Sequence, residues 1–380
     1  MLKKAGVILV HSLLLLVLHL IYFNLNWSLP LEYEMMMMLN KTESFIGGHG
    51  QFKKADYVFI NTAYDQVLTE TETEYLDTGT VAITDRRLLA KFFEKMTEFG
   101  NQHQYILCDI FFDRPSTEDS VLNNAIRYTP RVIASSEYDI EKKKLIEPVI
   151  AVRSGQADYI TYEGLVSKVR LYAAETHKKT LPLLMYEDMN GVSARVTSLG
   201  LFCNDSYILR SVYPRYFFDM STMNQHEMRL KQVVDILNMN GKMFYDNALK
   251  GKVIIIGNFS TDIHNTFVGS MPGSLVLFNT YLTLQAGYHS LGIWWMLFAL
   301  AAFAGLCYYE LFYKKERPQR TNRSWHRIFI HLLGLTSLCV VVSILSGVLF
   351  GVHITIIPII IYLELIRNLK KIIHLKKKKI

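Results

Sequence analysis

Apolar residues in this chain are concentrated in four long runs, and these runs restrict its fold more than any other feature of the sequence. A helix needs roughly 20 apolar residues to cross a bilayer core of about 30 Å, because every backbone amide there must bond within its own segment. The runs at residues 5–23, 291–313 and 328–350 meet this length with few charges. The run at 352–366 is shorter and contains Pro358, which is typical either of a span supported by flanking residues or of a re-entrant segment. We predict four transmembrane helices.

The first run has some features of a secretory signal peptide, because Lys3 and Lys4 precede it. No small residues at the spacing of a cleavage site follow the run, however, and no cysteine follows closely enough for a lipoprotein anchor. We therefore interpret it as an uncleaved signal anchor.

The distribution of charge predicts the orientation of the chain. Residues 28–290 contain 26 Lys and Arg against 31 Asp and Glu, whereas the rest of the chain contains 15 basic and 3 acidic residues. The formal charge of +7 is therefore a sum of an acidic segment and basic flanks. Because Lys and Arg close to membrane ends stay in the cytoplasm, we predict that both termini and the loop at 314–327 are cytoplasmic and that residues 28–290 lie outside.

These observations define the predicted organisation of a multi-pass protein of the bacterial inner membrane, with its large domain in the periplasm. The segments are a cytoplasmic N-terminus (1–4), a signal anchor (5–23), a connector (24–54), an extracytoplasmic domain (55–290), a span (291–313), a basic loop (314–327), two further spans (328–350 and 352–366) and a basic tail (367–380).

Within the external domain, short apolar runs alternate with segments of helical periodicity. We predict strands at 55–61, 105–112 and 131–135 and helices at 84–99 and 117–128, with Thr84 and Ser116 as capping residues. This alternation is typical of a parallel sheet flanked by helices. The predicted fold class is thus an α/β domain with a mostly parallel sheet, plus α-helical transmembrane segments.

The middle of the domain is less regular. Residues 145–152, 165–173 and 207–217 are predicted as strands, and residues 192–202 as a helix. The apolar run at 251–257 then predicts a central strand, and residues 274–286 have helical spacing and lead almost directly into the second span. We predict a three-layer sandwich with the strands at 105–112 and 252–257 in the centre of its sheet.

The cysteines and the basic tail limit the partners. Cys108 and Cys203 both lie in the external segment, so the sequence leaves open a disulfide between them and a buried free thiol at Cys108. No Cys or His spacing indicates a metal site. The lysines of residues 367–380 follow a predicted span directly, and we interpret them as contacts to lipid headgroups and not as a nucleic-acid arm.

Charged residues near strand ends are the candidate ligand-binding residues. Asp109, Asp113 and Arg114 lie at or after the end of a predicted central strand, and Asp262 follows the closing strand. In open parallel sheets, ligands bind beyond the carboxyl ends of the strands. Structural roles are the alternative, with Asp109 capping a turn and Asp113 pairing with Arg114 or with a helix N-terminus.

Asp85 and Arg86, at the start of the first predicted helix of the domain, complete the candidate set. An acidic residue at this position also complements the helix dipole, which requires no function. No GxSxG, HExxH, P-loop or glycine-rich fingerprint accompanies these residues, so we predict no catalytic residue, no metal and no cofactor.

Three segments together resemble one known family. The run GTVAITDRRLLAKFFE with YILCDIFFDRPSTEDSVLNNAI, the later GLVSKVRLY, and GKVIIIGNFSTDIHNTFVGSMPGSLVLFNTYL are similar to the CHASE sensory domain, type two (cyclase- and histidine-kinase-associated sensory extracellular). The resemblance covers about residues 55–287 and implies an extracytoplasmic sensor that signals to a cytoplasmic kinase or cyclase. Only about 14 residues follow the last predicted span, so we expect the output to lie on a separate protein.

Two classes of function remain open at this level. The first is a sensory or ligand-binding module that is not itself an enzyme and reports to a signalling or envelope partner; a homodimer is compatible with it. The second is a membrane-anchored envelope enzyme with Asp109, Asp113 and Asp262 around a metal, or a structural component of the envelope.

Overall fold

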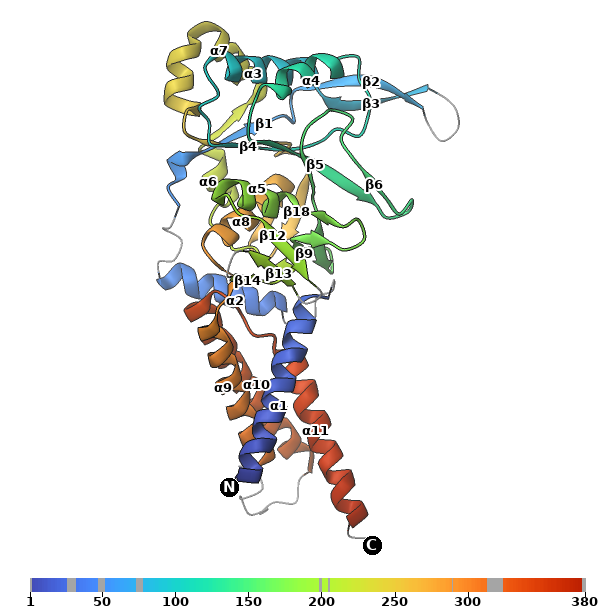
Figure 1. Ribbon diagram of the computed structural model, residues 1–380, viewed down its shortest axis with the longest axis vertical. Coiled ribbons are helices and arrows are strands. Elements are labelled where there is room, and N and C mark those ends of the chain that lie inside the picture. Colours follow the sequence, from blue (N-terminus) through green and yellow to red (C-terminus); the bar gives the residue numbers. More distant parts are fainter. Residues whose placement is uncertain are drawn as a thin grey trace. The chain divides into compact units, whose positions relative to one another are not determined.

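The chain forms two compact units in its computed structural model (Figure 1). The structure describes residues 2–25, 32–46, 52–72, 78–197, 200–203, 206–288, 290–312 and 324–377, so most of the predicted basic loop at 314–327 lies outside the described residues. The helical unit comprises Met1–Ile46, Ala194–Ser211 and Gly287–Ile380, and the α/β unit comprises Gly47–Ser193 and Val212–Ala286.

A seven-stranded sheet forms the centre of the α/β unit, in the order β16-β1-β17-β4-β5-β6 with β7 also paired to β5. All pairs are parallel except that of β5 with β6. The strands are β1 (Tyr57–Asn61), β4 (Tyr105–Phe111), β5 (Val132–Asp139), β6 (Lys144–Ile146), β7 (Ser154–Gln156), β16 (Glu227–Arg229) and β17 (Val253–Gly257). The predicted parallel sheet and the central position of β4 and β17 are confirmed.

One face of this sheet is covered by α3 (Arg86–Glu98), α4 (Asp119–Arg127) and α7 (Leu230–Phe244), which gather on the same side of the strands in Figure 1. Alternate strand residues point to opposite faces of a sheet. Ile106 and Ile254 accordingly share one hydrophobic core with the apolar stripes of these helices. Amphipathic helices bury such a stripe because removing apolar surface from water is favourable.

The opposite face is covered by α5 (Leu181–Asn190) and α8 (Gly273–Gln285), which contact the central strands and each other. Almost every residue of α8 is buried. Its apolar residues are distributed around the helix, as expected for a helix enclosed by protein, and the buried Asn279 and Thr280 donate to backbone carbonyls of the same helix. The predicted three-layer arrangement is therefore confirmed.

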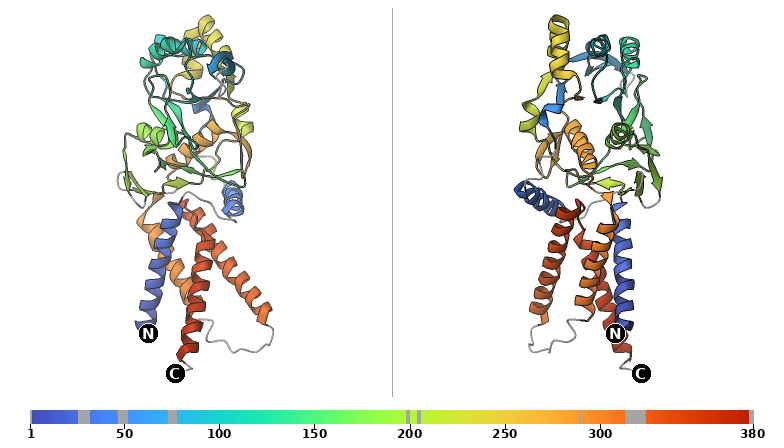
Figure 2. Two further views of the ribbon diagram at one scale, coloured as in Figure 1. Left: turned by 90° about the vertical axis from the view of Figure 1, so that its right-hand side faces the viewer. Right: turned by 60° about the vertical axis from the view of Figure 1, so that its left-hand side comes forward.

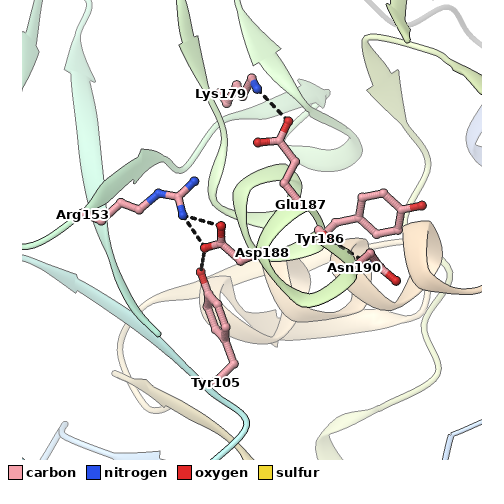
Figure 3. A network of polar contacts seen from close by, with 7 residues as sticks. All are labelled: Tyr105, Arg153, Lys179, Tyr186, Glu187, Asp188 and Asn190. Carbon is pink, nitrogen blue, oxygen red and sulfur yellow. Dashed lines mark hydrogen bonds and ion pairs between the residues drawn. The ribbon is translucent and has the colours of Figure 1, made fainter. Parts of the chain in front are cut away.

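A polar network fastens α5 to the amino end of β4 (Figure 3). The hydroxyl of Tyr105, the first residue of β4, donates to Asp188 Oδ2 over 2.6 Å. Arg153 Nη1 donates to both carboxylate oxygens of Asp188. Lys179, which precedes α5, pairs at 2.6 Å with Glu187, the neighbour of Asp188 on that helix. A buried tyrosine and a partly buried carboxylate thus satisfy each other across two layers.

Shorter strands complete the α/β unit. The strands β2 (Gln66–Glu72) and β3 (Thr78–Thr84) form a hairpin, and β9 (Leu165–Arg170) lies between β8 (Tyr159–Tyr162) and β18 (Ile263–Thr266), which pairs with β19 (Gly269–Pro272). Other elements are β10 (Tyr172–Ala173), β11 (Lys178–Lys179), β15 (Ser211–Val212) and α6 (Met220–Asn224).

The helical unit contains the apolar runs of the sequence. In Figure 2 its helices α1 (blue), α9 (orange) and α11 (red) lie side by side. Trp295 on α9 donates to Ser346 on α10 over 2.9 Å. Among the described residues, Lys4–Phe23 and Ile293–Leu311 are long and apolar enough to cross a membrane, and Gly334–Phe350 is a shorter apolar segment. The elements of this unit are α1 (Leu2–Phe23), α2 (Glu32–Ile46), α9 (Ile293–Leu311), α10 (Ser324–Phe350), α11 (Ile356–Lys377), β12 (Ala194–Thr197), β13 (Gly200–Cys203), β14 (Ser206–Ile208) and β20 (Ser290–Leu291).

Several local predictions were wrong. The predicted helix at 192–202 is a β-hairpin of β12 and β13, because cross-strand pairing with β14 and β20 outweighs local helical spacing. The predicted strand at 145–152 is reduced to β6. Helix α2 lies within the connector at 24–54, for which the sequence analysis had predicted no secondary structure. The cap of α3 is Asp85 and not Thr84, since Asp85 accepts from the Leu88 amide.

Cys108 and Cys203 are both buried, and no disulfide joins them. Burial raises the pKa of the Cys108 thiol, which keeps it protonated and unreactive. Of the two alternatives that the sequence left open, the structure has the buried free thiol.

Candidate functional site

A cavity of about 570 Å³ opens in the α/β unit at the carboxyl ends of the parallel strands. Parallel strands all end at the same edge of a sheet, so the residues that follow β1, β17 and β4 meet there. These residues include Thr62, Asn258 and Asp113, and the β2–β3 hairpin contributes a wall through Gln66 and Ile83. The cavity has a volume typical of small-molecule sites.

Five of the six candidate residues line this cavity, namely Arg86, Asp109, Asp113, Arg114 and Asp262. Asp85 does not line it. Its carboxylate accepts from the Leu88 amide at 3.0 Å, which satisfies one of the free amides in the first turn of α3. The structure therefore brings together five residues from distant parts of the sequence, and their role in binding a ligand stays a prediction.

Asp109 lies near the end of β4 and accepts a hydrogen bond from the hydroxyl of Ser135 on β5. Burial raises the pKa of the Asp109 carboxyl to about 6, and the negative charge of Asp262 adds to this effect. The Ser135 hydrogen bond and the nearby His264 oppose the increase. Asp109 thus titrates close to neutral pH, which is typical of functional carboxylates.

Asp262 belongs to a cluster with His264 and Tyr159. His264 Nε2 lies 3.1 Å from Asp262 Oδ1, and this hydrogen bond raises the pKa of the imidazole. The ring of Tyr159 lies against that of His264, with 4.8 Å between the ring centroids. Burial raises the pKa of the Tyr159 hydroxyl, which stays protonated and donates to the carbonyl of Gly273 at 3.1 Å.

Arg86 and Asp113 have structural partners at the edge of the cavity. Arg86 is 2% exposed, donates to Asp119 and to the carbonyl of Arg114, and places its guanidinium 5.5 Å from the ring centre of Phe112. It therefore ties α3 to the start of α4. Asp113 pairs with Arg114 at 3.5 Å, which is one of the structural roles that the sequence left open for it.

The described residues do not supply the ligands that a metal-dependent enzyme would need. Asp109, Asp113 and Asp262 line the same cavity, but in the part of the chain that the structure describes no three His, Cys, Asp or Glu side chains are grouped closely enough to hold a metal ion. Nor does Ser135 form a nucleophile–base pair with His264, since its hydroxyl donates to Asp109.

Sequence reasoning missed Thr62, Ser135, Glu137, Tyr159 and His264, all of which line the cavity. One of them carried a local signal, because His264 lies two residues after Asp262 and alternate residues of a strand share a face. The others lie at strand ends or bends whose neighbours are fixed only by the sheet order.

Comparison with known proteins gives one match. The model of a protein family described as the CHASE2 domain matches residues 22–308. No curated protein and no solved structure matches the chain.

Proposed function

The chain belongs to the CHASE2 domain family, a family of extracellular sensory domains, and from this membership we propose that it is an integral membrane sensor of the bacterial inner membrane. In this proposal the α/β unit lies in the periplasm and binds a small ligand in the cavity at the carboxyl edge of its sheet. The occupied state is passed to a separate signalling or envelope protein. The proposal assigns no catalytic activity to the chain.

The proposal rests on one contact: Asp262 and Tyr159 in the cavity wall touch Gly273, the first residue of α8. The amide of Gly273 donates to the carbonyl of Asp262 at 3.0 Å, and its carbonyl accepts from Tyr159. The approach is close, because a Cβ at Gly273 would lie 2.5 Å from Asp262 Oδ2. A ligand that displaces Asp262 or Tyr159 therefore displaces the start of α8.

The helix α8 is suited to pass on such a displacement. It is buried along its length, so a shift at Gly273 is transmitted through packed side chains instead of being absorbed by solvent. It ends at Gln285, and α9 begins at Ile293, so the connection between them is short. Shifts of packed helices are a common way of coupling a ligand site to a remote element.

The membrane placement is supported by charge and hydropathy. The acidic segment at 28–290 and the basic flanks agree with four spans and cytoplasmic termini. Reporter fusions at Lys143 and at Asn322 test the topology, and we expect them to read opposite sides of the membrane. The same side for both would contradict the four-span arrangement.

Filling the cavity tests the sensory role. Ala157 lines the cavity, whereas Ala174 is exposed and lies outside it. We expect Ala157→Trp to change the yield of partner that co-purifies or crosslinks from native membranes, and Ala174→Trp to leave that yield unchanged. A folded Ala157→Trp protein with unaltered partner yield and full in vivo function would refute a sensory cavity.

A further inference from the structure

We infer that the ligand of this cavity is a small organic cation, carrying a protonated amine or a guanidinium group, that binds between Asp109 and Glu137. The inference rests on the proposed function, because it names the chemical class of the ligand for the same site. It follows from the balance of charges around the cavity.

The basic groups of the cavity are already engaged. Arg86 pairs with Asp119, Arg114 pairs with Asp113, and His264 pairs with Asp262. In contrast, Asp109 and Glu137 form no ion pair with any residue in the described part of the chain. Asp109 is compensated only in part, by the hydroxyl of Ser135 and by the nearby His264, which is itself paired with Asp262.

The carboxylates also repel one another. The charge of Asp262 disfavours ionisation of Asp109. Glu137 is exposed at the rim of the cavity, and partial desolvation together with the charges of Asp113, Asp139 and Asp262 raises the pKa of its carboxyl. A cation bound between these groups would remove this repulsion, whereas an anion would increase it. Electrostatic complementarity therefore selects a positively charged ligand.

Thr62 provides an independent indication that the cavity takes a polar ligand. It directly follows β1 and lines the cavity, and its residue is only 1% exposed. Its amide donates to the carbonyl of Gly257 at 2.9 Å, but its hydroxyl has no hydrogen-bond partner among the described residues. A buried hydroxyl without a partner is costly, and a polar group of the ligand would supply that partner.

The geometry favours an organic cation over a metal ion. Metal ions need several ligand atoms at one point, and no described group of three acidic or His side chains provides this. The volume of about 570 Å³ is that of a small-molecule site. The cavity walls combine the Tyr159 ring and apolar Val81 with the polar Asn258, as expected for an amine on a carbon skeleton.

Binding of matched compounds to the full chain in lipid nanodiscs tests this inference. Putrescine, agmatine and spermidine are the cationic probes, butanediol is the neutral analogue of putrescine, succinate is an anionic one, and calcium chloride is the metal probe. We expect the cationic probes to bind by titration calorimetry and to raise the unfolding temperature, and the other probes to do neither.

Two variants assign the binding to the two unpaired carboxylates. Asp109→Asn and Glu137→Gln keep the size of each side chain and remove its charge. Because a charged hydrogen bond contributes about 1.5–3 kcal/mol, each should weaken putrescine binding by about tenfold or more. The exposed Glu141, outside the cavity, provides the control, and Glu141→Gln should bind putrescine as the unaltered chain does.

Several outcomes would overturn the inference. These are binding of succinate or calcium in preference to the amines, no binding of any cationic probe, or amine binding that both carboxylate variants leave unchanged. Each of them leaves the sensory proposal standing, because that proposal is tested separately by the effect of Ala157→Trp on the partner.

Discussion

The two ends of strand β4 place carboxylates in opposite situations. At the amino end, Asp188 accepts from the Tyr105 hydroxyl and from Arg153, so that its charge is compensated (Figure 3). At the carboxyl end, Asp109 lines the cavity, and its one hydrogen-bond partner among the described residues is the hydroxyl of Ser135. Burial raises the pKa of Tyr105, which keeps its proton available for Asp188, whereas burial at Asp109 opposes the charge itself.

This difference separates a structural site from a candidate functional one. A network whose donors and acceptors are all matched stabilises the fold and holds α5 on the sheet. A carboxylate that is buried without a cation reduces the stability of the empty protein, and such groups are concentrated at functional sites. Removing the carboxylate should therefore lower the stability of the protein at the amino end of β4 and raise it at the carboxyl end.

Ile255→Asp should have the largest effect, because it removes the sheet on which both ends depend. Ile255 is fully buried at the centre of β17, between β1 and β4. An unpaired buried charge costs several kcal/mol, a large part of a domain's stability of about 5–15 kcal/mol. We expect the protein to lack cooperative thermal unfolding of the α/β unit. A cooperatively folded Ile255→Asp protein would contradict the central placement.

At the amino end, Asp188→Ala should destabilise the protein by about 1–3 kcal/mol, because it leaves the buried Tyr105 hydroxyl without its acceptor. Urea unfolding of the full chain measures the change. The exposed pair of Lys95 and Glu98 provides the control, and Glu98→Ala should cost no more than about 1 kcal/mol. In the Tyr105→Phe background the cost of Asp188→Ala should decrease; equal costs in both backgrounds would show that the two groups are not coupled.

At the carboxyl end, Asp109→Asn should stabilise the protein above about pH 6. Burial raises the pKa of Asp109 to about 6, against about 3.9 in an unfolded chain, so the folded state binds the proton more tightly. Stability therefore falls as the pH rises from about 4 to about 6, and Asn avoids this loss. We expect a gain of about 1 kcal/mol at neutral pH, reduced from the full shift by water in the cavity.

Thermal unfolding at pH about 4 and about 7.5 measures this gain, which should be absent at the lower pH. A variant that is less stable than the unaltered chain at neutral pH would show that Asp109 is held by compensating partners.

The smallest effect on stability is expected for a flexible Gly-Ser insertion after Gly287, between α8 and α9. Lengthening a loop costs only about 0.6 kcal/mol per doubling, so folding and membrane insertion should persist. Transmission from the cavity should be lost, because the short connection is replaced by a flexible one. Partner co-purification and in vivo function report on this loss. Full function of the insertion variant would favour a structural role in the envelope over a sensory one.

The sequence alone was sufficient for features that depend on neighbouring residues. The apolar runs identified α1 and α9, and local runs and periodicity identified β4, β17 and α3 close to their observed bounds. Strand ends in a parallel sheet also directed attention to Asp109 and Asp262, because the rule that ligands bind there needs only the order of elements. These signals depend on neighbouring residues only, so they can be recognised without knowing the tertiary structure.

Only the tertiary structure decided which of these residues face one another and which are already paired. The helix α7 went unrecognised although its apolar residues have helical spacing, and the predicted helix at 192–202 is the β12–β13 hairpin because its cross-strand partners lie elsewhere in the chain. Likewise Arg86 is paired with Asp119, while Asp109 forms no ion pair with any residue that the structure describes. The physical reason is that pairing, burial and pKa depend on groups distant in sequence, which the fold alone brings into contact.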